Sequence, residues 1–213
     1  MLEMEDIIGL EVVSEDARVV GIVEGVGLDV EEWKIPLLRV ALKKGVEDTV
    51  RVKKPLFSSA KLHIRTSGVE SISDTVTLKV KMSDVRSISV EEGTVFMTAA
   101  DIIGKMVICR KGRDIGFAHD VIFIPEKDWS VPQIEVKLDK YVLGDLKLKK
   151  SLLSSPIIRI QTSDIKTVGD IIMLKIDHEE LKDFLEKKTD KKAEQNPGAS
   201  KSATEDMPGY GRL

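Results

Sequence analysis

An internal repeat covers most of the chain and limits what it can fold into. Residues 6–28 match residues 101–123, 95 positions later, and 8 of these 23 pairs are identical. Residues 33–79 match residues 129–175, 96 positions later, with 17 of 47 pairs identical. Two copies of one compact unit that share no reactive residues favour a scaffold over an enzyme. The repeat therefore predicts two similar domains in tandem.

Strict alternation of apolar and polar residues indicates that both copies are made of β-strands. Leu38, Val40 and Leu42 alternate with Arg39, Ala41 and Lys43, and the second copy keeps the apolar positions as Ile134, Val136 and Leu138. A period of two places one face of a strand against a core and the other in solvent. Because aromatic residues make up only 4% of the chain, the cores must be aliphatic. We expect an all-β protein.

Two glycines occur at the same place inside a predicted strand of each copy. Gly21 and Gly116 lie within otherwise apolar runs. Glycine weakens a strand, so at such a position it usually marks a bulge or a tight bend. Small curled sheets need such bends to close on themselves. Each copy is therefore predicted to be a small β-barrel or a strongly coiled sheet of five or six strands.

The repeat also sets the expected domain boundaries. The first repeat spans residues 1–90, a linker spans 91–99, and the second repeat spans 100–177. A short helix is expected over 178–187, because Asp177 and Glu180 form a capping-box pattern before an apolar stripe. From residue 188 to 213 the sequence lacks material for a core, which predicts a disordered tail.

Composition favours a cytoplasmic protein without an intramolecular disulfide. Cys109 is the one cysteine of the chain, and we expect it to be a small buried residue rather than a reactive thiol. A net charge of −3 gives no overall attraction to nucleic acid. The beginning of the sequence has no signal-peptide pattern, and no stretch is apolar for long enough to cross a membrane.

Specific residues of the second copy resemble a known fold family. The run from Ile102 to Ile124, with Gly104, Gly112 and Gly116 as turn glycines, resembles the opening of the PRC-barrel, a small β-barrel. Residues 163–175 resemble the closing hairpin of its archaeal members. The first copy departs from the pattern, with Ala17 where Gly112 stands in the second. The resemblance implies two tandem small PRC-type β-barrels over about residues 5–180.

The layout is most similar to the tandem PRC-barrel proteins of archaea. This resemblance implies a non-enzymatic adaptor of the FtsZ-based division machinery. Its partners would be the FtsZ anchor SepF and a sister PRC-barrel protein, with homo- or hetero-oligomers or filaments as possible assemblies. Such a protein would be cytoplasmic and located at midcell through a membrane-associated partner.

A search for reactive groups predicts no catalytic, cofactor-binding or metal site. His63, His119 and His178 are far apart, lack metal-ligand spacing and do not align with one another between the copies. Asp74 and Asp170 do align, but each lies beside a turn, where aspartate commonly bonds its own backbone. An enzyme or small-ligand carrier would need a cavity inside a barrel.

Partner binding is predicted at four residues. Trp33 and Trp129 either close the end of a barrel or anchor a protein partner. Tyr210 and Leu213 end a tail that is either a plain solubilising segment or a tether presenting a short motif. Lysines at 53, 54, 147, 149 and 150 are either a solvated strand edge or an RNA contact, and the alternative function is therefore a ribosome- or RNA-associated PRC-barrel factor.

Overall fold

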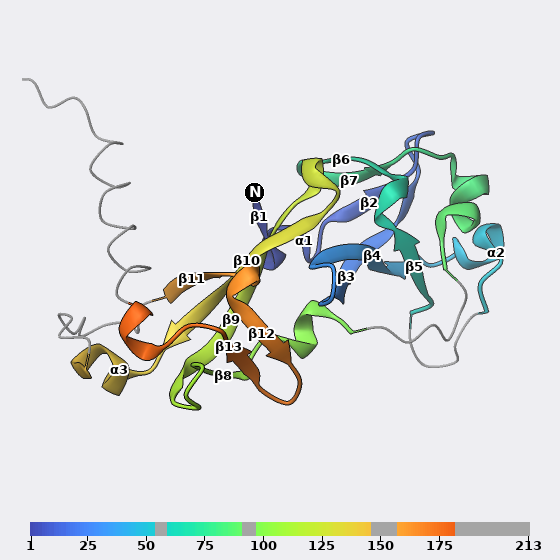
Figure 1. Cartoon of the computed structure of the whole chain (residues 1–213). Coiled ribbons are helices and arrows are strands. Elements are labelled where there is room, and N and C mark those ends of the chain that lie inside the picture. The colour runs from blue at the N-terminus through green and yellow to red at the C-terminus, as the bar shows by residue number, and fades with distance from the viewer. Residues whose placement is uncertain (54–58, 91–96, 146–156, 182–213) are drawn as a thin grey trace, which may run out of the picture.

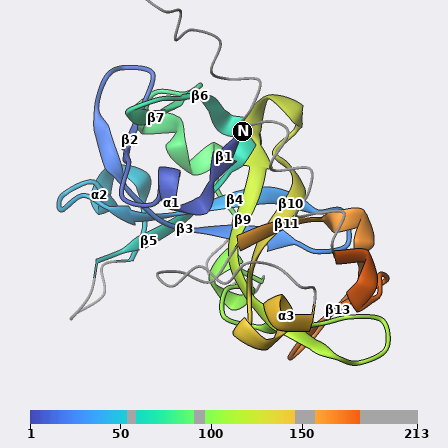
Figure 2. The ribbon, with the colours of Figure 1, turned by 90° about the vertical axis from the view of Figure 1, so that its left-hand side faces the viewer.

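The computed structural model describes residues 1–53, 59–90, 97–145 and 157–181. Within the described residues, thirteen strands join in one continuous sheet, and helices are few and short. The sheet curls into two halves that lie side by side (Figure 1), and Figure 2 shows β4 (Lys34–Leu42) next to β10 (Ser130–Leu138), through which the halves join. The predicted all-β class is confirmed.

The first sheet, here called unit 1, has the strand order β5-β4-β3-β2-β7-β6. All neighbours are antiparallel except β2 and β7, which are parallel. Its strands are β2 (Glu11–Val13), β3 (Val19–Asp29), β4 (Lys34–Leu42), β5 (Lys61–Arg65), β6 (Val69–Ile72) and β7 (Thr75–Leu78). Its helical turns are α1 (Met4–Ile7), α2 (Glu47–Val50) and the 3₁₀ segments Thr66–Gly68 and Met82–Ile88.

The second sheet, unit 2, repeats this order as β11-β10-β9-β8-β13-β12, with β8 and β13 parallel. Its strands are β8 (Met106–Ile108), β9 (Asp114–Ile124), β10 (Ser130–Leu138), β11 (Ile157–Gln161), β12 (Ile165–Val168) and β13 (Ile172–Leu174). Its helical turns are α3 (Lys140–Asp145) and the 3₁₀ segments Ala99–Asp101, Pro125–Lys127, Thr162–Asp164 and His178–Glu180. The remaining strand, β1 (Leu2–Glu3), precedes unit 1.

Neither unit is a closed barrel by hydrogen bonding in the described part of the chain. The ladder of unit 1 is open between β5 and β6, and that of unit 2 is open between β11 and β12. The reason lies in the corner between these strands, a three-residue 3₁₀ turn at Thr66–Gly68 or Thr162–Asp164 in place of a hairpin turn. In unit 1, Ser89 instead bridges Ile64 at the free side of β5.

Aliphatic side chains fill the interior of both units, as the alternation predicted. Leu38 and Val40 are fully buried on β4, and their counterparts Ile134 and Val136 are fully buried on β10. Cys109 is buried as well, as expected. The same sequence period thus produces the same buried face twice.

The strand glycines are confirmed as sites of a bulge and of close backbone approach. The β2–β3 register shifts between Val12 and Val13, opposite Gly21, and the β8–β9 register shifts at the matching place beside Gly116. A Cβ atom at Gly21 would lie 2.1 Å from the carbonyl oxygen of Ala41, and one at Gly116 would lie 2.1 Å from that of Lys137. Only glycine lets the two backbones come this close.

The chain past β13 begins as predicted. Asp177 caps the turn His178–Glu180, and the amide N–H of Asp177 donates to the Glu180 carboxylate at 2.6 Å, completing the capping box. The rest of the helix expected to residue 187 lies outside the described residues, as does the tail with Tyr210 and Leu213. The domain boundaries stay a prediction.

Candidate protein-interaction site at the junction of the two units

The two units meet where β4 and β10 pair antiparallel. Lys34 faces Ser130 across this contact. On either side of that pair, the amide N–H of Ile35 donates to the carbonyl oxygen of Trp129 (3.0 Å), and that of Val131 donates to the carbonyl oxygen of Trp33 (2.7 Å). Because Ile35 matches Val131 and Trp33 matches Trp129 in the repeat, the two bonds are equivalent, and the junction has an approximate twofold axis.

Each unit also pairs with the segment that precedes the other unit in the chain. β1, which precedes unit 1, pairs with β9 of unit 2 through Leu2 with Phe123 and Glu3 with Ile122. Residues 97–98, which precede unit 2, lie along β3 of unit 1: Thr98 bridges Gly27, and Leu28 donates its N–H to Met97 at 2.8 Å. These contacts occupy matching positions of the repeat. The exchange ties the units into one body through two sites besides the β4–β10 contact.

Both predicted tryptophans lie at this junction. Their backbones have left-handed conformations, with φ of 51° at Trp33 and 54° at Trp129, in the hairpins that end β3 and β9. Trp129 is 7% exposed, and its ring stacks on Phe123 with centroids 5.8 Å apart and planes within 5°. Trp33 is half-buried against the shared core. Their role in partner binding stays a prediction.

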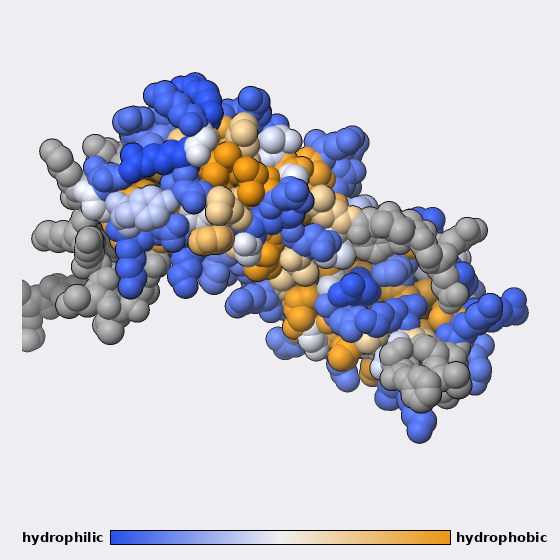
Figure 3. Space-filling model, turned by 90° about the horizontal axis from the view of Figure 1, so that it is seen from below, coloured by the Kyte–Doolittle hydropathy of each residue, from blue (hydrophilic) through white to orange (hydrophobic). Residues whose placement is uncertain are grey.

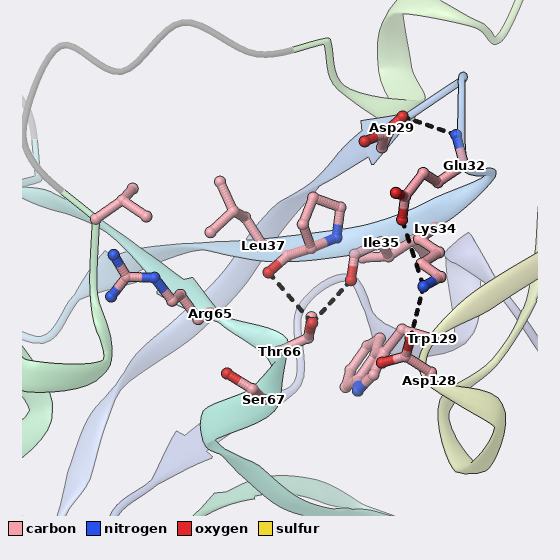
Figure 4. A pocket seen from close by; sticks show the side chains of 12 residues that line it. Asp29, Glu32, Lys34, Ile35, Leu37, Arg65, Thr66, Ser67, Asp128 and Trp129 are labelled. Atoms are coloured by element: carbon pink, nitrogen blue, oxygen red, sulfur yellow. Dashed lines mark hydrogen bonds and ion pairs between the residues drawn. The ribbon is translucent and has the colours of Figure 1, made fainter.

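A shallow pocket of about 500 Å³ opens beside Trp129 (Figure 4). Asp128 of unit 2 also lines it, and the remaining walls come from unit 1, including the corner Thr66–Ser67 and the side chains of Lys34 and Arg65. The Thr66 hydroxyl donates to the carbonyl oxygens of Ile35 (2.8 Å) and Pro36 (3.2 Å), which fixes the corner against β4. The tryptophan of one unit thus completes a pocket of the other.

Charges at the rim of this pocket bind the units to each other. The Lys34 ammonium lies 2.7 Å from the Asp128 carboxylate of unit 2 and 3.4 Å from that of Glu32. The hydrogen bond that the Lys34 ammonium donates to Asp128, followed by the one it donates to Glu32, raises the pKa of Lys34 above its usual value. Since these groups are largely exposed, the ion pairs add little to stability and serve mainly to shape the rim.

A second pocket of about 460 Å³ repeats the arrangement with the units exchanged. Trp33 of unit 1 lines it together with Thr162 and Ser163 of unit 2. The Thr162 hydroxyl donates to Val131 at 2.9 Å and to Pro132 at 3.2 Å, as Thr66 does in the first pocket. The junction therefore presents two related recesses, of a size and mixed polarity that suit protein side chains.

The other candidate residues do not gather at this site. His63 lies on β5, and burial, followed by the charges of Arg39 and Lys61, lowers its pKa. His119 is exposed on β9, and His178 is buried at the capped turn after β13. Within the described residues, no group of three or more His, Cys, Asp or Glu side chains is placed to hold a metal ion. The same residues contain no helix long and apolar enough to span a membrane.

Sequence reasoning did not predict that the segments preceding the two units pair with the opposite unit. Asp6 and Asp101 occupy matching positions of the repeat, and each caps a short turn by accepting the N–H of Glu3 (2.8 Å) or Thr98 (2.7 Å). Those turns direct β1 and residues 97–98 onto the opposite unit. The repetition of this aspartate at the first position of each copy was the available signal.

Comparison with known proteins adds little. No family model matches the chain, and no curated protein matches it significantly. A solved structure that does match is a putative 16S ribosomal RNA processing protein, RimM, from Pseudomonas aeruginosa. The match covers 73% of this chain and 97% of that one, at 9% identity and a TM-score of 0.24. A TM-score this low does not establish a shared fold.

Proposed function

We propose that this chain is a tandem PRC-barrel protein that acts as a protein-interaction adaptor. The observation that carries the proposal is the reciprocal junction, in which each unit supplies a strand segment and a tryptophan to the other. Two units coupled in this way hold their outer surfaces in a constant relation. A body that presents two related but different surfaces at a set distance is suited to bringing proteins together.

The finer proposal is a role in the archaeal FtsZ-based division machinery. It rests on the sequence resemblance to archaeal tandem PRC-barrel proteins. The partners would then be a SepF-like FtsZ anchor and a sister PRC-barrel protein, and the chain would reach midcell through the membrane-associated partner. The two junction pockets are the candidate contact sites.

A binding titration of the full chain with purified SepF and with a sister PRC-barrel protein tests this role. We expect dissociation constants in the micromolar range or below, and a tagged copy should form a midcell band in living cells. Lys34→Glu, which places a third carboxylate beside Glu32 and Asp128, should weaken binding through the first pocket. Lys44→Glu, the same charge reversal at an exposed position of unit 1 that lines neither junction pocket, is the control. Absence of binding to both proteins would refute the division role.

The alternative function is RNA or ribosome association through the lysine edge. Lys53 is exposed, whereas Lys54 and Lys147–Lys150 lie outside the described residues. This function requires RNA binding that weakens steeply as salt is raised, with loss on replacement of Lys149 and Lys150. Binding that does not respond to salt, or no binding, would exclude it.

A further inference from the structure

The outer face of unit 2 exposes apolar side chains where β8, β9 and β13 lie together. Phe117 on β9 is 43% exposed, and Ile171, directly before β13, is 37% exposed. Met106 on β8 and Met173 on β13 are half-buried on the same side, opposite the fully buried Val107 and Ile172. Apolar residues likewise interrupt the hydrophilic surface in the space-filling view from below (Figure 3).

These residues form a row that crosses the strands. Met106 faces Phe117, Phe117 faces Lys137 on β10, and Lys137 faces Ile157 on β11. Since Val107 and Ile172 are parallel neighbours, the residues before them, Met106 and Ile171, extend the row to β13. Neighbouring strands are about 4.8 Å apart, so four steps span about 19 Å. We call Ile171, Met106, Phe117, Lys137 and Ile157 the cross-strand row.

Unit 1 has the same row of backbone positions with different side chains. Thr75 faces Glu11, Glu11 faces Ile22, and Ile22 faces Ala41, which faces Lys61. Of these, only Ile22 is a large apolar residue, 46% exposed. Because one fold accepts both rows, the fold does not require the apolar side chains of unit 2. An exposed apolar row without a structural need is typical of a contact surface.

We propose that the cross-strand row of unit 2 binds an amphipathic α-helix of a partner protein, with a carboxylate of that helix facing Lys137. Apolar residues on one side of a helix recur once per turn, every 5.4 Å, close to the strand spacing. Side chains on one side of an extended peptide recur about every 6.8 Å, a poorer match. A helix of about four turns covers the row.

The one charged side chain of the row favours an acidic helix. Lys137 is exposed between Phe117 and Ile157. In the described part of the chain, Lys137 forms no ion pair. A second copy docked face to face would bring two Lys137 ammonium groups to the same contact, which like-charge repulsion disfavours. The inference rests on the proposed function, because both make the chain a protein-binding module.

The test uses two fluorescently labelled helical peptides of about four turns, with identical leucine stripes and either glutamate or lysine beside the stripe. Fluorescence anisotropy with the full chain should show binding of the acidic peptide at micromolar levels, about threefold tighter than the basic one. Met106→Glu combined with Ile171→Thr gives unit 2 the residues of unit 1 and should weaken binding about tenfold or more. Lys137→Glu should reverse the preference between the peptides.

The matched control is the reverse exchange in unit 1, Glu11→Met with Thr75→Ile, which should leave binding at unit 2 intact. Equal binding of both peptides, no binding of either, or no effect of the unit 2 exchange would overturn the proposal. So would a dimer, seen by analytical ultracentrifugation, that the unit 2 exchange dissociates. If the exchanged variant binds the acidic peptide as tightly as the parent and also binds SepF or the sister protein, the row inference fails while the adaptor function stands. If peptide binding follows the expected pattern but neither protein binds, the division role fails alone.

Discussion

Units 1 and 2 have charged clusters at matching points of their sheets. The residue on β4 is positively charged, whereas its counterpart on β10 is negatively charged. In unit 1, Arg39 on β4 lies 3.5 Å from Glu24, and Lys61 lies 2.8 Å from the same carboxylate. In unit 2, the residue matching Arg39 is Glu135, which Arg159 of β11 contacts at 2.9 Å. The cluster of unit 1 stays within one sheet.

The cluster of unit 2 extends across the junction. Arg159 also contacts Glu3 of β1 at 2.7 Å, so it ties the strand that precedes unit 1 to the sheet of unit 2. Burial, followed by the charge of Glu135, raises the pKa of Glu3. Burial also raises the pKa of Asp120, which accepts the N–H of Met4 at 3.2 Å. A symmetric backbone therefore carries an asymmetric set of contacts, and the two halves of the junction should respond differently to mutation.

The largest difference is expected between the tryptophans. Trp129→Ala removes a buried, stacked ring and should lower the free energy of unfolding by about 3 to 5 kcal/mol. Trp33→Ala, at the half-buried matching position, should cost about half as much. Urea unfolding of both variants measures the two values. Equal losses would show that the two halves of the junction are energetically alike.

The next largest difference in stability is expected between the two strand glycines. Gly116→Ala should destabilise the protein by about 3 kcal/mol, because its Cβ meets backbone atoms and its φ of 148° does not suit an L-residue. Gly21→Ala meets the same steric contact without the positive φ and should cost somewhat less. Thermal unfolding separates the two. A neutral effect of either change would mean that the paired strands move apart at little cost.

The asymmetric ion cluster is tested by Arg159→Ala. The change leaves the buried Glu135 carboxylate without its cation and should cost about 2 kcal/mol. Lys61→Ala in unit 1 removes an exposed partner and should cost less than about 1 kcal/mol. Hydrogen exchange at Leu2 and Glu3 should rise in the Arg159 variant alone. Equal exchange in both variants would contradict the role of Arg159 in holding β1.

A smaller effect is expected at the first turn of each unit. Ala17 has a φ of 58°, where unit 2 has Gly112 at 79°. Ala17→Gly should therefore stabilise unit 1 by about 0.5 to 1 kcal/mol, and Gly112→Ala should destabilise unit 2 by a similar amount. Differential scanning calorimetry records both changes as shifts of the melting temperature. Shifts of the same sign would show that the two turns differ beyond their side chains.

The smallest effect concerns pH. A carboxyl group with a raised pKa binds its proton more readily in the folded state, so folding gains stability as the pH falls from neutrality towards the ordinary value of 3.8 for Asp120. Asp120→Asn removes this titration. The stability of the variant relative to the parent should thus be greatest at pH 7 and decline on acidification. A difference that does not depend on pH would contradict the raised pKa.

Much of the fold could be predicted because its signals are local. Alternation at Leu38, Val40 and Leu42 identified β4 and its buried face, and the repeat then identified β10. The glycines at 21 and 116 marked bulges, and Asp177 with Glu180 marked a capped turn. Barrel closure could not be inferred, because it depends on the angle at the Thr66–Gly68 corner rather than on any strand pattern.

Two like β units with aliphatic interiors are specified locally, since strand period and turn chemistry act between residues close in the chain. Three features arise only in the folded molecule: the exchange of β1 and residues 97–98 between units, the burial of Trp129 at their junction, and the meeting of Met106, Phe117 and Ile171 on an outer face. These contacts join segments that are far apart in sequence. Packing of whole sheets selects such pairings, and no local pattern specifies them.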